Sequence, residues 1–205
     1  MNLRLTGLLG LGLLIMSPLM SPAELRPGRH LAHFAKARLQ LPGLLEECRA
    51  LTARKIPYVY GGTSDEGMDC SASVQRLFRN RGISLPRTSE GQANTLARRG
   101  QLWRVAAGES ELDVFKRLKP GELLFWVKNE SPNRVSHVMV FVGMDGKKAK
   151  LWGARGTGKT GLSGSGVDFF HYSPGSRKRS RIVAHGAPRP STTTESHYNI
   201  TVVSS

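Results

Sequence analysis

Hydrophobic periodicity changes once along the chain, and this change sets the fold class. Before Glu122 the apolar residues recur at helical spacings, apart from a short strand expected at 101–105. The predicted helices cover 43–54, 70–81, a segment from Thr88 or Ser89 to about Arg99, and 109–117. After Glu122, β-branched and aromatic runs between turn residues predict strands at 122–127, 136–143, 148–152, 166–171 and 180–185. Helices followed by strands predict an α+β domain, with a helical half packed on an antiparallel sheet.

A cysteine stands at the start of one predicted helix. After Cys70, the apolar residues Val74, Leu77 and Phe78 form one buried stripe, and Asp69 can cap the helix start. Unpaired backbone N–H groups and the positive end of the helix dipole lower the pKa of a thiol placed there. We therefore interpret Cys70 as a candidate nucleophile with an increased thiolate fraction.

A histidine in the second half is the best candidate for the base that a thiol nucleophile requires. His137 begins the apolar run 136–143, which is typical of a buried strand that ends at Gly143. A cysteine and a histidine that are distant in sequence and adjacent in the fold are the usual arrangement of cysteine hydrolases.

Five separate segments, in this order and spacing, resemble the NlpC-type cell-wall peptidases, which are papain-like cysteine enzymes that cut peptidoglycan peptides. The resemblance covers roughly residues 44–185. The matching segments are Pro57-Tyr58-Val59-Tyr60-Gly61-Gly62, Asp69-Cys70-Ser71, Leu85-Pro86-Arg87-Thr88-Ser89 with Gln92, Leu118-Lys119-Pro120-Gly121-Glu122-Leu123-Leu124-Phe125, and His137-Val138-Met139-Val140-Phe141-Val142-Gly143.

The resemblance implies a function and a set of site residues. Cys70 is then the nucleophile and His137 the base, in a papain-like domain whose helical half carries the cysteine and whose sheet carries the histidine. Tyr58, Asp69 and Ser71 are expected to line the substrate cleft, the last two near the free amine of a stem peptide. The implied activity is that of an exported endopeptidase that cuts the amide between D-glutamate and a diamino acid, with no metal or other cofactor.

The chain departs from the family pattern at one position. Members usually carry a third polar residue, most often histidine, where this chain has Gly153. An ordered water, a backbone carbonyl, Thr157 or Arg155 remains as a substitute, and arginine is the poorest because it cannot accept a hydrogen bond from imidazole. This departure leaves open a weakly active or inactive cell-wall binding module of the same fold. An amidase or acyltransferase that uses the same Cys/His pair is a further alternative.

Composition divides the chain into segments. A charged start at Arg4, an apolar stretch and Ser21-Pro22-Ala23 indicate a cleavable leader and a periplasmic or secreted protein. About 160 residues remain without leader and tail, which is enough for one domain with a core. The predicted segments are a signal peptide at 1–23, a basic N-terminal segment at 24–42, an NlpC-type catalytic domain at 43–186 and a flexible C-terminal tail at 187–205.

The chain is strongly basic. Lys and Arg number 30 against 15 acidic residues, a net charge of +15. Such a charge attracts polyanions, and for an exported protein these are anionic envelope polymers and lipid head groups. The basic residues are dispersed apart from Arg177-Lys178-Arg179 and Arg181, which we interpret as a solvated loop, so the sequence argues against a dedicated nucleic-acid module. We expect a monomer.

One further motif and the second cysteine are considered as functional features. Residues 153–160 satisfy the phosphate-binding pattern G-x-x-x-x-G-K-[ST], but the glycines that follow cannot sustain the helix that this site requires, so we expect a glycine-rich hairpin loop beside the cleft. Cys48 lies at an apolar position of a predicted helix and is interpreted as a buried inert thiol, although the sequence does not exclude a disulfide with Cys70.

Overall fold

The computed structural model describes residues 41–156 and 159–190. The expected signal peptide at 1–23, nearly all of the basic segment at 24–42, most of the tail at 187–205 and Thr157 lie outside the described residues. The helices are α2 (Leu41–Ala53), α3 (Cys70–Asn80), α4 (Ser89–Arg98) and α5 (Glu111–Arg117). The strands are β1 (Thr63–Ser64), β2 (Gly67–Met68), β3 (Leu102–Arg104), β4 (Leu123–Lys128), β5 (Ser131–Asp145), β6 (Lys148–Ala154), β7 (Val167–Tyr172) and β8 (Ser180–Gly186). No helix within these ranges has the length and apolar character needed to cross a bilayer.

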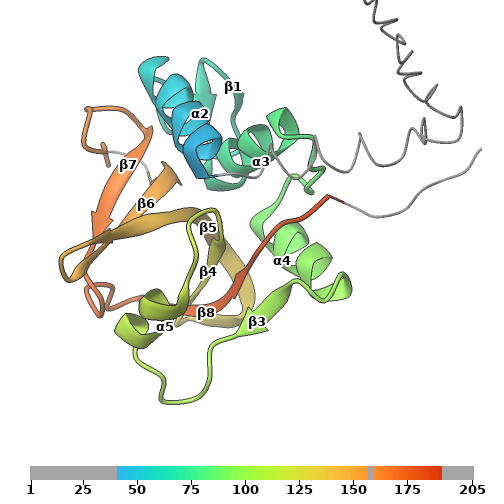
Figure 1. Cartoon of the computed structure of the whole chain (residues 1–205), viewed down its shortest axis with the longest axis vertical. Helices are drawn as coiled ribbons and strands as arrows, with labels where there is room; N and C mark the ends of the chain where they lie inside the picture. Colours follow the sequence, from blue (N-terminus) through green and yellow to red (C-terminus); the bar gives the residue numbers. More distant parts are fainter. Residues whose placement is uncertain (1–40, 157–158, 191–205) are drawn as a thin grey trace, which may run out of the picture.

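Six strands form one antiparallel sheet in the order β3-β8-β4-β5-β6-β7. Figure 1 shows α2 and α3 together over one part of the sheet, with α5 well apart from them. The small hairpin of β1 and β2 precedes α3 and leads the chain into it. The expected α+β architecture, with helices first in the chain and an antiparallel sheet after them, is confirmed.

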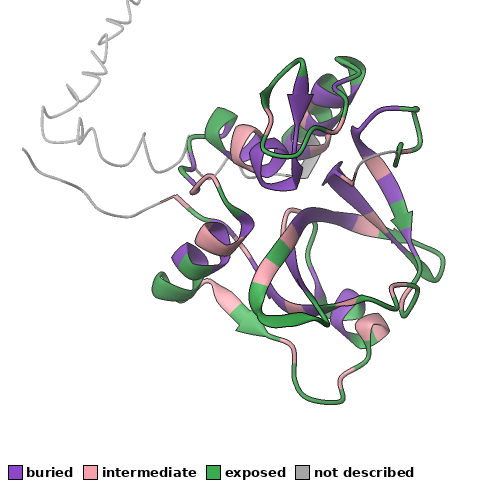
Figure 2. Cartoon of the chain, turned by 180° about the vertical axis from the view of Figure 1, so that it is seen from behind, coloured by how far each residue is buried: buried purple, intermediate pink, exposed green. Residues whose placement is uncertain are grey.

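Alternate residues of the central strands enter two different cores, so these strands are buried on both faces. Figure 2 shows buried residues, in purple, along the strands of the sheet. On β5, Val138 and Val140 pack with α2, α3 and α4, whereas Met139 and Phe141 pack with α5. The first core includes Cys70. Because β5 has a helical layer on each side, its position is fixed by apolar contacts along most of its second half.

The helices begin where the sequence provides a cap. The side chains of Asp69, Thr88 and Ser110 accept hydrogen bonds from backbone N–H groups in the first turns of α3, α4 and α5. Every predicted helix and strand is present within about two residues, except that β5 begins at Ser131 rather than at residue 136. The additional part of β5 is mostly exposed and polar, so it carries no hydrophobic period for a sequence prediction to detect.

The segment between β6 and β7 does not form a phosphate-binding helix. Its described residues from Lys159 to Gly166 contain turns and bends but no helix, as the glycine content predicts. The backbone N–H groups of Gly166 and Val167 both donate to the carbonyl of Ile56, which ties the end of this loop to the chain just before Tyr58. A Cβ at Gly166 would lie 2.1 Å from the backbone nitrogen of Tyr58, so only glycine permits this close approach.

Candidate active site

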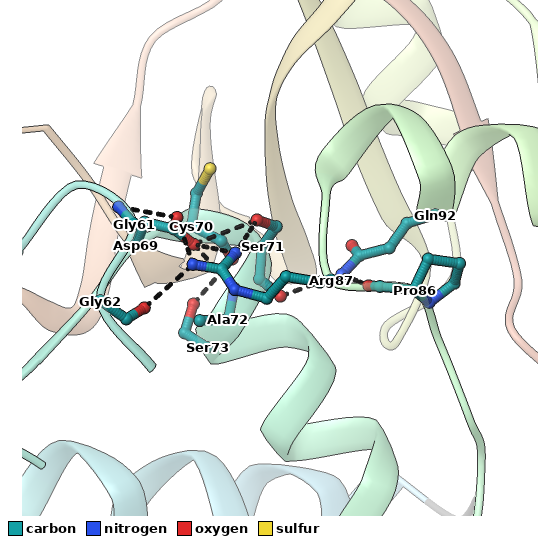
Figure 3. Close-up of polar contacts among 10 residues, drawn as sticks. All are labelled: Gly61, Gly62, Asp69, Cys70, Ser71, Ala72, Ser73, Pro86, Arg87 and Gln92. Carbon is teal, nitrogen blue, oxygen red and sulfur yellow. Dashed lines mark hydrogen bonds and ion pairs between the residues drawn. The ribbon is translucent and has the colours of Figure 1, made fainter. Parts of the chain in front are cut away.

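Asp69 organises the start of α3. One carboxylate oxygen accepts hydrogen bonds from the N–H of Ala72 at 2.9 Å and the hydroxyl of Ser71 at 3.0 Å, and the other accepts from the N–H of Gly61 at 3.1 Å. These contacts tie the tyrosine-glycine loop to the helix that begins with Cys70. Figure 3 shows the Cys70 sulfur pointing away from this network of contacts. The sulfur is therefore held at the helix start without taking part in the cap.

Arg87 completes this network and was not predicted as a site residue. Its guanidinium donates to both oxygens of Asp69, at 3.0 and 2.7 Å, and also to the hydroxyl of Ser71 and the carbonyl of Gly62 (Figure 3). Arg87 and the other contacts lower the pKa of Asp69, although burial opposes them. Arg87 belongs to the segment Leu85-Pro86-Arg87-Thr88-Ser89, which is one of the segments that resemble the family. The resemblance did not assign a function to the arginine.

The thiol of Cys70 is buried and protonated at neutral pH. Burial raises its pKa, and the negative charge of Asp69 raises it further. Backbone N–H groups of Val138, Ser71 and Cys70 itself lower the pKa, but they do not outweigh burial. The expectation that the helix start increases the thiolate fraction is therefore wrong, since desolvation is the larger effect.

Four of the predicted site residues meet in one cleft of about 500 Å³. Tyr58, Asp69, Cys70 and Ser71 all line it, together with Arg87 from the loop before α4 and Ser136 from β5. Burial raises the pKa of Tyr58 to about 12, with smaller contributions from Cys70 and Asp69, so the phenol stays neutral and retains its proton as a hydrogen-bond donor.

His137 lies next to this cleft rather than in its lining. It borders a second cavity of about 430 Å³, and Tyr58 and Ser136 line both cavities. The residue after it, Val138, supplies the backbone N–H at the Cys70 sulfur. Among the described residues no hydrogen bond joins Cys70 to His137, and the imidazole contacts Trp126 at 5.5 Å between ring centroids. The thiol thus meets β5 at Val138, next to His137, and contacts between a nucleophile and its base are often long before substrate binds.

Gly153 leaves the imidazole without the third group that the family pattern supplies. The Nε2 atom of His137 is fully buried and has no hydrogen-bond partner among the described residues. A Cβ built at Gly153 would lie 3.6 Å from the hydroxyl of Ser73 and 3.8 Å from Met139, and its φ of +147° disfavours any side chain. The sequence supplies no orienting side chain at this position, and the backbone conformation there would strain one.

Two arginines lie near the imidazole instead. Burial lowers the pKa of His137 well below its usual value, and the positive charges of Arg177 and Arg155 lower it further. Arg177 is half-buried, with its guanidinium 5.1 Å from the ring centroid of Trp126 and 5.6 Å from that of Tyr172. The interpretation of Arg177-Lys178-Arg179 as a solvated loop is therefore wrong for its first residue, because stacking on two aromatic rings draws that side chain inward.

Cys48, one tryptophan and two histidines outside the cleft have structural roles. Cys48 and Cys70 are both free thiols, which excludes the disulfide alternative, and Cys48 is completely buried in the first core. Trp152 is buried and donates to the hydroxyl of Thr52 at 3.0 Å. His171 pairs with Asp145 and His185 with Glu122, so the structure gives each of these histidines a carboxylate partner.

Comparison with known proteins gives partial matches to longer enzymes. The chain is 31% identical over 88 residues to a gamma-D-glutamyl-L-lysine dipeptidyl-peptidase of Bacillus cereus, covering 43% of this chain and 22% of the relative. It is 36% identical over 90 residues to a gamma-DL-glutamyl hydrolase of Bacillus subtilis, covering 43% of this chain and 18% of the relative. The chain thus spans only about a fifth of the length of these relatives.

Similarity to a solved structure and to a family model concerns the domain described above. The crystal structure of the NlpC/p60 domain of the peptidoglycan hydrolase SagA matches with a TM-score of 0.45 and 20% identity, covering 71% of this chain and 97% of that one. The model of the NlpC/P60 family matches residues 55–176, which is more than half of the chain and includes the whole segment from Tyr58 through β6. The chain belongs to the NlpC/P60 family.

Proposed function

We propose that the protein is an exported peptidoglycan endopeptidase that hydrolyses the amide between γ-D-glutamate and a diamino acid in stem peptides. One observation carries the proposal: Cys70 opens a helix inside a cleft that also contains Tyr58, Asp69 and Ser71, with His137 one residue away from the backbone N–H at the sulfur. The relatives named for γ-D-glutamyl-L-lysine and γ-DL-glutamyl bonds support the choice of substrate. The leader pattern of residues 1–23 supports export.

In the proposed mechanism both groups begin neutral. As the Cys70 sulfur attacks the γ-carbonyl carbon, the thiol proton passes to His137, and backbone N–H groups at the start of α3 stabilise the oxyanion. The imidazolium then gives this proton to the leaving nitrogen of the diamino acid, and the C–N bond breaks. A thioester between Cys70 and the glutamyl group remains. Water attacks it, with His137 accepting a proton from water and returning it to the thiolate.

Digestion of purified murein sacculi tests this proposal. We expect the full-length chain without its leader to release peptide fragments whose masses locate the cut after γ-D-glutamate. Cys70→Ala should release none. The second cysteine provides a matched control: Cys48→Ala removes a buried thiol that does not line the cleft, so it should lower the free energy of unfolding by about 1–2 kcal/mol and retain cleavage. Intact sacculi after incubation with folded wild-type protein would refute the activity.

The surroundings of His137 favour a second candidate, a cell-wall binding module without catalysis. A catalytic imidazole must become positively charged, and here two arginines and burial oppose that charge while Gly153 supplies no acceptor. On this alternative, Cys70→Ala binds sacculi as tightly as the wild type, and neither protein releases peptides. The digestion experiment therefore separates the two candidates directly.

A further inference from the structure

The cavity beside His137 is strongly basic. Its volume is about 430 Å³, and its lining includes the cationic residues Lys128, Arg155, Lys159, Arg177, Lys178 and Arg179. None of the other lining residues is an aspartate or a glutamate. The cations come from three separate parts of the chain, at the end of β4, in the loop after β6 and in the loop between β7 and β8. Their convergence is thus a product of the fold rather than of one charged run.

Within the described ranges, five of these six cations have no carboxylate partner, and Arg155, Lys159 and Arg177 are among the five. Arg155, Lys159 and Arg177 form no ion pair with any residue in the described ranges, whereas Lys128 pairs with Glu130 at 3.4 Å. Arg155 lies over the ring of Phe170 at 5.7 Å, and Arg177 lies over Trp126. Stacking fixes the plane of a guanidinium and leaves the N–H groups at its edge available for an acceptor.

The acidic side chain that acts electrostatically on Arg177 is Glu111 of helix α5, and it is already engaged. Glu111 accepts hydrogen bonds from the hydroxyl of Tyr172 at 2.9 Å and from the N–H of Gly175 at 2.7 Å. Its charge raises the pKa of Arg177 only in part, because burial and Arg155 lower that pKa to about 10. A half-buried guanidinium whose pKa is lowered in this way lacks a counter-ion, and an anionic ligand would provide one.

The position of the cavity identifies which part of a substrate would reach it. In the proposed mechanism His137 gives its proton to the leaving nitrogen, so the residue attached to that nitrogen lies on the imidazole side of the cleft. The basic cavity extends from His137 on that side and shares Tyr58 and Ser136 with the cleft of Cys70. An amide substrate bound across both cavities would place its leaving residue among the unpaired cations.

We propose that Arg155, Lys159 and Arg177 bind a carboxylate carried by the leaving residue of the substrate, an inference that rests on the proposed function. The carboxylate supplies the counter-ion that the three cations lack. Because it also offsets the positive charge near His137, substrate binding favours the imidazolium that the proposed mechanism requires. The glycine-rich loop at 153–160 thereby acquires a role, since it carries Arg155 and Lys159.

Binding by a matched pair of dipeptides tests the proposal without cleavage. The ligands are γ-D-glutamyl-L-lysine with a free lysine carboxylate and the same dipeptide with a lysine carboxamide, titrated calorimetrically into the Cys70→Ala protein. We expect the carboxylate to bind at least tenfold more tightly, since two or more charge-assisted hydrogen bonds are lost with the carboxamide. In Arg155→Gln and Lys159→Gln, each made with Cys70→Ala, this preference should fall severalfold.

Arg104→Gln is the matched control, because Arg104 is an exposed arginine of β3 that lines a different cavity. It should retain the full preference. Arg177→Lys keeps the charge but loses the planar fork, so it should reduce the preference only in part, and thermal unfolding of each variant checks its fold. Equal affinity for the two dipeptides, or a preference that survives in Arg155→Gln and Lys159→Gln, would overturn the proposal. A carboxylate preference without cleavage by the wild type would refute the proposed function and support this site.

Discussion

At the scale of single residues, two opposing effects act on Cys70. The start of α3 supplies backbone N–H groups that favour the thiolate, and the cleft removes water that would solvate it. Only 7% of the Cys70 surface is exposed, which explains why desolvation is the larger effect. Because the pKa of His137 is lowered and that of Cys70 is raised, both groups are neutral at pH 7 and do not form an ion pair.

The pH dependence of Cys70 alkylation follows from these shifts. A raised pKa means that the thiolate is scarce at neutral pH and becomes abundant only as the pH rises toward that pKa. We expect the rate of reaction with iodoacetamide to be low at pH 6 and to rise about tenfold per pH unit between pH 7 and pH 9. Mass spectrometry of the modified peptide gives the rate, and Cys70→Ala, which retains only the buried Cys48, gives the background. A plateau of fast alkylation from pH 5 to pH 8 would instead indicate a thiolate-imidazolium pair.

Residue roles were predictable where a local motif carries them. Asp69 and Cys70 are neighbours in sequence, so helix capping predicts their relation without knowledge of the fold. Arg87 reaches Asp69 from 18 residues away along the chain, and Arg177 reaches Trp126 from a different loop of the sheet, so local spacing does not encode either contact. The direction of the Cys70 pKa shift was mispredicted for the same reason, since burial depends on the whole cleft.

At the scale of elements, the buried hydroxyl of Ser73 links α3 to strand β6 by hydrogen bonds. Ser73 donates to the carbonyl of Cys70 at 2.9 Å and accepts from the N–H of Ala154 at the end of β6 at 3.1 Å. Both Ser73 and Ala154 are completely buried. This bridge joins the first turn of α3, which carries the Cys70 thiol, to β6, the strand that leads to Arg155 and Lys159.

Ser73→Ala should loosen this junction. The N–H of Ala154 would lose its partner in a buried place, so we expect the free energy of unfolding in urea to fall by about 1–3 kcal/mol. Because the first turn of α3 also positions Cys70, kcat on a γ-D-glutamyl dipeptide should fall more than KM changes. Ser84→Ala is the control, since Ser84 is exposed and forms none of the hydrogen bonds described here. Unchanged stability in Ser73→Ala would show that the bridge contributes nothing.

The boundaries of helices and strands were predictable where buried residues leave an apolar pattern in the sequence. The inner parts of β4 and β5 are apolar on both faces and stand out in the sequence. The first residues of β5 do not, yet they pair with β4 through a bulge. The bulge leaves Ser136 without a Cα register partner on β4, and Ser136 lines both cavities. A bulge depends on how two strands meet, so neither strand's own sequence predicts it.

At the scale of the whole molecule, acidic and basic side chains have different roles. The described carboxylates are largely engaged: Asp65 pairs with Arg54 and Arg76, and Asp69 with Arg87. A net charge of +15 means that basic residues outnumber the carboxylates that could pair with them. A surplus of this size contributes little to the fold and acts chiefly on the approach of polyanions such as cell-wall polymers.

Binding of the intact Cys70→Ala protein to sacculi should therefore be strongly salt-dependent. Raising NaCl from 50 mM to 1 M shortens the screening length to about 3 Å, and we expect the bound fraction in a pelleting assay to fall at least fivefold. Sacculi stripped of covalently attached anionic polymers are the control and should bind weakly at both salt concentrations. The unfolding midpoint, measured at each salt concentration, separates screening of the surface from damage to the fold. Binding that stays constant from 50 mM to 1 M NaCl would mean that specific contacts in the cleft, rather than the net charge, hold the protein on the wall.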